Sequence, residues 1–173
     1  MSKSRLFFSA NQTNSQLTIL LLGDYNTHKH QALECLASTK LAPRVVIMYD
    51  CHNAAIKLAD SSKPLNVLLI DTPDQDRFRP LLAKNFHFPD IVLACITKKN
   101  EFDDYQVMAA KSNKPEVPLV YIIRENQENL LADAPANTVV FKANDTSESF
   151  FASIAQKVKE MAEYQPSPPR LDI

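Results

Sequence analysis

The stretch that decides the fold is Leu17-Thr18-Ile19-Leu20-Leu21-Leu22-Gly23-Asp24-Tyr25-Asn26-Thr27-His28-Lys29-His30. Residues 17–22 are almost continuously apolar, which is typical of a strand buried on both faces of a sheet. The run ends at Gly23, the only glycine among 173 residues, where average usage would give roughly a dozen. A helix-like segment follows over 28–38, so the stretch predicts a strand, a loop and a helix in that order.

The rest of the chain repeats this alternation of short apolar runs and helix-like segments. The pattern predicts further strands over 44–49, 65–70, 90–96, 117–123 and 138–142, and further helices over 52–61, 101–112 and 147–162. Such alternation is typical of a mostly parallel sheet with helices on both faces. We therefore expect a three-layer α/β fold with six strands, in one domain over residues 16–164. Residues 1–15 are expected to be a flexible segment, and the proline-rich residues 165–173 an extended tail.

Composition narrows the class of protein. The formal net charge of −1 offers no basic field for nucleic acid, and no apolar stretch approaches the roughly 20 residues of a membrane span. Residues 1–15 contain no apolar segment of the kind found in secretory signals. The cysteines, Cys35, Cys51 and Cys95, are scattered and odd in number. We expect an intracellular protein of a reducing compartment, cytoplasm or nucleus, with no membrane span and no direct nucleic-acid recognition.

The residues after the first strand follow the outline of a phosphate-binding loop, G-x-x-x-x-G-K-[ST]. Gly23 stands at the first glycine and Lys29 at the lysine that contacts phosphates. His28 replaces the second glycine, so an imidazole obstructs the close approach of backbone N–H groups to phosphates. His30 replaces the hydroxyl residue and supplies no oxygen ligand for magnesium. The loop keeps its outline and lacks two of the residues on which its chemistry depends.

A second motif follows the third expected strand, Asp71-Thr72-Pro73-Asp74-Gln75-Asp76-Arg77-Phe78-Arg79. It resembles D-T-A-G-Q-E-R-F-R, the switch region of small GTPases of the Ras and Rab type. Residues 96–102 resemble that family's strand-to-helix corner, and residues 141–144 stand where the family has its S-A-K motif. The resemblance covers roughly residues 17–162 and implies a small-GTPase-like P-loop fold.

The chain departs from this family at the nucleotide-binding positions. Asp74 replaces the switch glycine whose backbone meets the γ-phosphate, and a carboxylate there would repel phosphate. The base-reading N-K-x-D motif falls on residues 124–127, where Arg124 and its neighbours change all three specified positions. Gln75 matches the water-positioning glutamine, but it catalyses nothing without nucleotide and metal. The degenerate site implied by the resemblance comprises Gly23, His28, Lys29, His30, Asp71, Asp74, Gln75 and Arg124.

Taken together, the resemblance and these departures imply a pseudo-GTPase, similar in kind to centromere protein M. On this reading we expect the protein not to be an enzyme and to hold no cofactor. It would act as a scaffold subunit through protein contacts, with Arg77, Phe78 and Arg79 as the candidate interface, because arginine and aromatic side chains favour hot spots. No metal site is expected, since the histidines lack compact ligand spacing. Lys29 is interpreted as a solvated lysine at a helix start and Asp71 as a structural carboxylate.

Two other hypotheses stay open. A phospho-receiver domain has a helix between its second and third strands, a phosphorylatable aspartate and a lysine after the last strand. Asp24, the 52–61 helix, Asp71 and Lys142 fit that order, although Gly23 occupies one of the paired magnesium-binding acids. The same predicted helix departs from small GTPases, which join these strands by a hairpin. The third hypothesis is a weak, unconventional nucleotide binder that uses Lys29 and Asp71.

Overall fold

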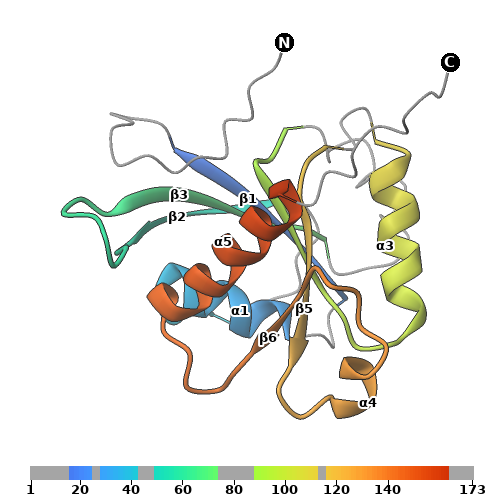
Figure 1. Ribbon diagram of the computed structural model, residues 1–173. Coiled ribbons are helices and arrows are strands. Elements are labelled where there is room, and N and C mark those ends of the chain that lie inside the picture. Colours follow the sequence, from blue (N-terminus) through green and yellow to red (C-terminus); the bar gives the residue numbers. More distant parts are fainter. Residues whose placement is uncertain (1–15, 25–27, 43–48, 74–87, 113–115, 164–173) are drawn as a thin grey trace, which may run out of the picture.

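The computed structural model (Figure 1) describes residues 16–24, 28–42, 49–73, 88–112 and 116–163. These residues form a six-stranded sheet in the order β2-β3-β1-β4-β5-β6. The strands are β1 (Leu17–Leu22), β2 (Asp50–Ile56), β3 (Leu65–Asp71), β4 (Ile91–Cys95), β5 (Leu119–Arg124) and β6 (Thr138–Phe141). The described helices are α1 (Lys29–Ala37), α3 (Asn100–Ala110), α4 (Glu128–Leu131) and α5 (Ser147–Glu163).

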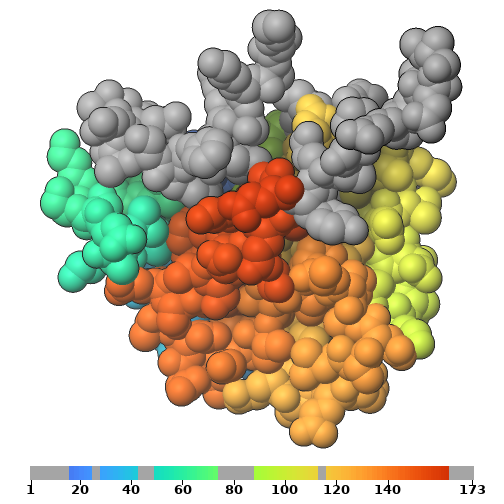
Figure 2. All heavy atoms as spheres, in the orientation of Figure 1, coloured from blue at the N-terminus to red at the C-terminus, as the bar shows by residue number. Residues whose placement is uncertain are grey.

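The sheet is mostly parallel and is covered by helices on both faces. Every neighbouring pair of strands is parallel except β2 and β3, which are antiparallel. Figure 1 shows α1 beside α5 on one face and α3 on the opposite face. In the space-filling view α5 lies across the visible face, between the β2–β3 end of the sheet and α3 (Figure 2). The expected three-layer α/β fold with six strands is therefore confirmed.

Each face of the sheet has its own apolar core. On one face Leu33 and Leu36 of α1 pack with the apolar stripe of α5, which is Phe150, Phe151, Ile154 and Val158. On the other face Phe102 and Tyr105 of α3 pack against β4 and β5. Burying a side chain of this size contributes about 1.5–3 kcal/mol. This stripe is thus the contact that holds α5 against the sheet.

None of the described helices combines the length and the apolar character that a membrane span needs.

The start of α5 shows why the chain turns there. The Thr146 hydroxyl accepts a hydrogen bond from the Ser149 backbone N–H at 3.1 Å, and the Ser149 hydroxyl accepts from the Thr146 N–H at 2.9 Å. These reciprocal bonds satisfy backbone donors that a helix start leaves free. Thr146 is therefore the N-cap residue of α5.

The predicted helix over 52–61 is wrong. Residues 50–56 form β2 instead, which pairs with β3 in continuous register from Asp50 opposite Asp71 to Ile56 opposite Leu65. The alanine-rich composition of this segment suits a helix, but pairing with a distant strand decides its structure. The strand predicted over 44–49 lies outside the described residues apart from Tyr49, which directly precedes β2.

Candidate functional site

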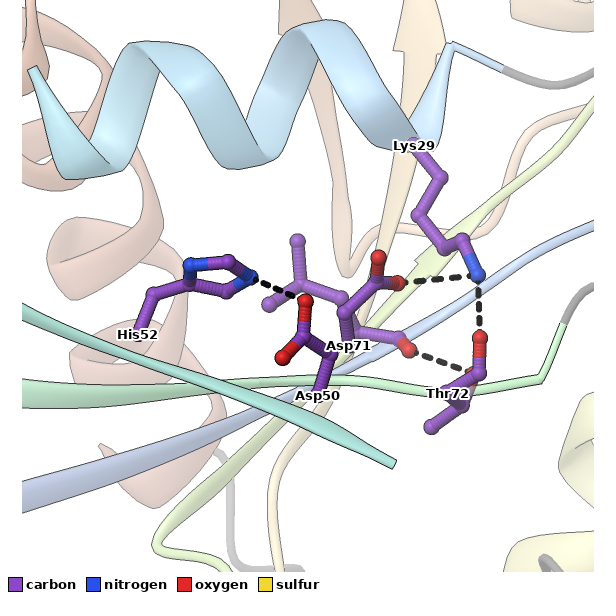
Figure 3. A network of polar contacts seen from close by, with 6 residues as sticks. Lys29, Asp50, His52, Asp71 and Thr72 are labelled. Carbon is purple, nitrogen blue, oxygen red and sulfur yellow. Dashed lines mark hydrogen bonds and ion pairs between the residues drawn. The ribbon is translucent and has the colours of Figure 1, made fainter. Parts of the chain in front are cut away.

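The candidate site lies where β1 and β3 end side by side. Leu21 of β1 is paired with Asp71 of β3, so the loops that follow both strands leave the same edge of the sheet. Lys29, the first residue of α1, reaches toward this edge (Figure 3). In open α/β sheets this carboxyl edge is the usual place for ligands.

Lys29 is held by the protein itself. Its Nζ lies 2.9 Å from Asp71 Oδ1, with side-chain exposures of 4% and 6%. The same ammonium group donates to the carbonyl oxygen of Thr72. The Thr72 hydroxyl in turn donates to the carbonyl oxygen of Leu21 at 2.7 Å. Lys29 is therefore buried rather than solvated, because the end of β3 offers it a carboxylate and a carbonyl at the same place (Figure 3).

His28 fills the position of the second loop glycine with a packed ring. Its Nε2 lies 3.0 Å from the carbonyl oxygen of Ile122, which can only accept, so Nε2 carries the proton. The ring is stacked on Phe141 with centroids 6.5 Å apart. Burial lowers the pKa of His28 to about 4, although the bond to Ile122 works in the opposite direction; Arg124 lowers it further. The imidazole is thus neutral at pH 7 and behaves as a core side chain.

Gly23 and His30 occupy the two ends of the same segment. Gly23 has a φ of 151°, in the region that favours glycine, so the backbone alone explains this residue. The His30 side chain is 37% exposed, and its Nε2 lies 3.4 Å from Glu34 Oε1 on the next turn of α1. His28 and His30 therefore point in different directions, one toward the Ile122 carbonyl and the other toward Glu34.

Arg124 belongs to a separate feature, a cavity of about 690 Å³. The loops after β5 and β6 and the outer side of α1 form its walls, with Glu34, Cys35, Arg124, Asn126, Phe141 and Asp145 among the lining residues. Both loops carry residues that align with the N-K-x-D and S-A-K motifs, the loop after β5 the first and the loop after β6 the second. The cavity therefore brings together the segments that the resemblance assigns to base recognition, with different residues in them.

The acidic side chains around this cavity accept hydrogen bonds from backbone N–H groups of the loops that form its walls. Glu125 Oε1 accepts from the Ala143 N–H at 3.3 Å, and Asp145 Oδ2 accepts from the Lys142 N–H at 2.8 Å. Glu34 Oε1 accepts from the Leu41 N–H at 2.8 Å, and this bond is the largest cause of the lowered pKa of Glu34. Each carboxylate fixes a loop, so the rim is organised without a ligand.

Five of the sequence-predicted residues cannot be placed. Asp74, Gln75, Arg77, Phe78 and Arg79 lie outside the described residues. Of the rest, Lys29 and Asp71 are brought into direct contact, His28 lies behind them toward β5, and Arg124 lines the cavity. Within the described ranges, no three His, Cys, Asp or Glu side chains gather closely enough to hold a metal ion.

Sequence reasoning missed the part of the site contributed by β2. Asp50 stands opposite Asp71 in the β2–β3 register, and its Oδ2 lies 3.1 Å from His52 Nε2 (Figure 3). Because residues 52–61 were expected to be helical, nothing placed these two residues beside β3. In the structure the exposure of β2 alternates, but the exposed residues Cys51, Asn53 and Ala55 are not consistently polar, so the sequence carries no clear alternation of apolar and polar residues.

Comparison of the chain with models of known protein families and with curated protein sequences finds no match.

Proposed function

We propose that this protein is a small-GTPase-like domain that does not bind GTP in the usual way and acts as a protein-interaction subunit. The observation that carries the proposal is the buried contact of Lys29 with Asp71 and with the Thr72 carbonyl. In a working phosphate loop the corresponding lysine contacts phosphates. Here its charge is already compensated within the protein.

The cost of replacing these contacts opposes phosphate binding. A phosphate that approached Lys29 would meet the negative charge of Asp71 at the same ammonium group. Separating the pair would leave Asp71 as an uncompensated buried charge, which costs several kcal/mol. The neutral ring of His28 supplies no compensating charge. The same contact argues against a weak nucleotide binder that uses Lys29 and Asp71.

Topology supports the GTPase-like template over the receiver template. The adjacent antiparallel pair β2–β3 is the hairpin arrangement implied by the resemblance. Receiver-type folds have the order 2-1-3-4-5, whereas here β3 lies between β2 and β1. The helix that had favoured a receiver is a strand, and Asp71 is buried against Lys29 while Lys142 is exposed. A phosphoacceptor role for Asp71 would require that ion pair to open.

The nucleotide half of the proposal is tested on protein purified without added nucleotide. The protein is denatured, the supernatant is chromatographed for GTP, GDP and ATP, and thermal melts are recorded with and without Mg²⁺ and nucleotide. We expect a clean supernatant and an unchanged melting temperature. A stoichiometric nucleotide, or a shift of several degrees that Lys29→Ala abolishes, would overturn the proposal.

The interaction half is tested by affinity capture from cell lysate. Wild-type protein and the double variant Arg77→Ala/Phe78→Ala serve as baits, with Ser153→Ala on the exposed side of α5 as the matched control. We expect the wild type and the control to retain the same proteins and the double variant to lose them. Equal capture by all three baits would remove residues 77–79 from the proposal.

A further inference from the structure

The cavity of about 690 Å³ beside α1 has the size of a small-molecule site, because pockets of this kind commonly have volumes of roughly 300–1,000 Å³. Its walls come from three segments that are distant in sequence: α1 with the residues directly after it, the loop after β5, and the loop after β6 with the start of α5. Arg124 and Phe141, the last residues of β5 and β6, both line it. In α/β sheets ligands bind outside such carboxyl ends of strands. The proposed function makes no use of this cavity.

One ion pair at the rim is compensated within the protein. Glu34 Oε2 lies 3.7 Å from Lys40 Nζ, and Glu34 Oε1 lies 3.4 Å from His30 Nε2. The same Oε1 also accepts from the Leu41 N–H at 2.8 Å. Because Glu34 and Lys40 offset one another, neither charge calls for a ligand.

Three other charged side chains of the walls have no such compensation. Arg124, Glu125 and Asp145 line the cavity, and none of them belongs to an ion pair within the described ranges. The guanidinium group of Arg124 also makes no hydrogen bond to the described part of the chain. Glu125 and Asp145 are held in place by the backbone N–H groups of Ala143 and Lys142. The cavity of the described structure therefore presents one guanidinium group and two carboxylates without counter-ions.

We propose that this cavity binds a free basic amino acid, lysine or arginine. The α-carboxylate of such a ligand pairs with Arg124, whose planar guanidinium group suits a carboxylate. Its α-ammonium group and its side-chain cation pair with Glu125 and Asp145. The charged residues of the lining, which are Glu34, Lys40, Arg124, Glu125 and Asp145, carry one net negative charge. A basic amino acid carries one net positive charge, so ligand and cavity are complementary.

The presence of both signs of charge narrows the class of ligand. A phosphate or a dicarboxylate would meet Arg124 but would be repelled by Glu125 and Asp145. A diamine would meet both carboxylates but would leave Arg124 without an anion. The side-chain amides of Gln31 and Asn126, which also line the cavity, add donors for the carboxylate of the ligand. Of these classes, a ligand with charges of both signs is the one that uses all three uncompensated groups.

Isothermal titration calorimetry with four matched compounds tests the class of ligand. L-lysine carries all three charges, whereas cadaverine lacks the carboxylate, L-norleucine lacks the side-chain cation and Nα-acetyl-L-lysine lacks the α-ammonium group. We expect L-lysine to bind with a dissociation constant on the order of 1 mM or below, because its hydrogen bonds are charge-assisted but the cavity is open to water. Each of the other three compounds should bind at least about tenfold more weakly.

Variants test whether the binding takes place in this cavity. Arg124→Gln removes the partner of the carboxylate, so it should weaken the binding of L-lysine about tenfold and should not weaken that of cadaverine. Glu125→Gln keeps an acceptor for the Ala143 N–H but removes a carboxylate charge, so it should weaken both. Lys159→Gln and Glu163→Gln, at exposed positions of α5 outside the cavity, are the matched controls and should bind like the wild type. A loss confined to L-lysine cannot come from misfolding.

The inference fails on any of three results. They are no heat from L-lysine in the millimolar range, equal affinities for L-lysine and cadaverine, and unchanged binding of L-lysine by Arg124→Gln. Equal affinities would show that the walls act only as an acidic surface. None of these results bears on the proposed lack of nucleotide binding, which is measured separately on protein purified without nucleotide.

Discussion

The ammonium group of Lys29 lies 2.9 Å from Oδ1 of Asp71, and both side chains are almost completely removed from water. The contact joins the first residue of α1 to the last residue of β3. Burying two charges is expensive, so a pair of this kind need not add net stability compared with apolar residues. Removing one partner alone is different, because it leaves the other charge buried and uncompensated.

We expect Lys29→Met to lower the free energy of unfolding by about 3–5 kcal/mol, the range for a broken buried pair. The double variant Lys29→Met/Asp71→Asn should recover most of this loss, because it also removes the orphaned charge. Urea denaturation followed by circular dichroism measures both. Lys157→Met breaks an exposed ion pair with Glu160 and should cost at most about 1 kcal/mol. Equal losses in the single and double variants would show that the Lys29–Asp71 charge interaction is not what holds the site.

The fold was predictable from sequence where burial leaves a local pattern. Strand β1 is buried on both faces, so its sequence is a continuous apolar run that predicts a buried strand. Helix α5 buries one stripe of side chains, so apolar residues recur at helical spacing in its sequence and predict a helix. Strand β2 lies at the sheet edge, with its exposed face carrying Cys51, Asn53 and Ala55, so its pattern is weak. Its structure depends on pairing with β3, and this contact cannot be recognised from the few residues on either side of β2 in the sequence.

The site was only partly predictable for a related reason. The motifs located Lys29 and Asp71, and the parallel sheet implied that the ends of β1 and β3 are close. The motifs could not show which groups Lys29 contacts, because a lysine at the start of a helix is usually solvated. The depth at which its Nζ lies depends on how α1 packs over the sheet, through Leu33 and Leu36. The packing of His28 on Phe141 depends on β6, which is remote in sequence.

The three cysteines should differ sharply in reactivity. Cys51 is exposed, whereas burial raises the pKa of Cys35 to about 11 and that of Cys95 to about 12. At pH 8 only about a thousandth of Cys35 would be thiolate, the reactive form. We expect one fast thiol per folded chain with Ellman's reagent and three after unfolding in urea. Cys51→Ser should abolish the fast phase and Cys35→Ser should retain it; a second fast thiol would show that the cavity wall at Cys35 opens readily.

Glu101 is expected to stabilise the start of α3. Its Oε2 accepts from the backbone N–H groups of Thr97 at 2.7 Å and Lys98 at 3.0 Å, in a buried position. Glu101→Ala leaves these donors without their acceptor and should cost about 1–3 kcal/mol in urea denaturation. Glu101→Gln retains one acceptor oxygen and should cost less. Glu128→Ala, in the exposed first turn of α4, should change stability by no more than about 0.5 kcal/mol. If the two alanine variants were equally stable, the Glu101 bonds would contribute nothing measurable.

His28 should make the fold sensitive to acid. Its pKa falls from 6.5 to about 4 on folding, chiefly through burial, so the unfolded chain binds a proton more readily than the folded one. The stability contributed by the neutral ring is therefore fully present above pH 6.5 and is lost progressively as the pH falls toward 4. A shift of this size corresponds to at most about 3 kcal/mol.

The variant His28→Gln separates this effect from the titration of the carboxylates. Glutamine can still donate to the Ile122 carbonyl but does not titrate, so the stability gap between wild type and variant should narrow or reverse between pH 7 and pH 4. His30→Gln, which changes a partly exposed ring, should follow the wild-type pH dependence. Urea denaturation at several pH values measures all three proteins. Parallel curves for wild type and His28→Gln would mean that His28 is protonated in the fold without cost, and that its ring does not fill the loop as a neutral core side chain.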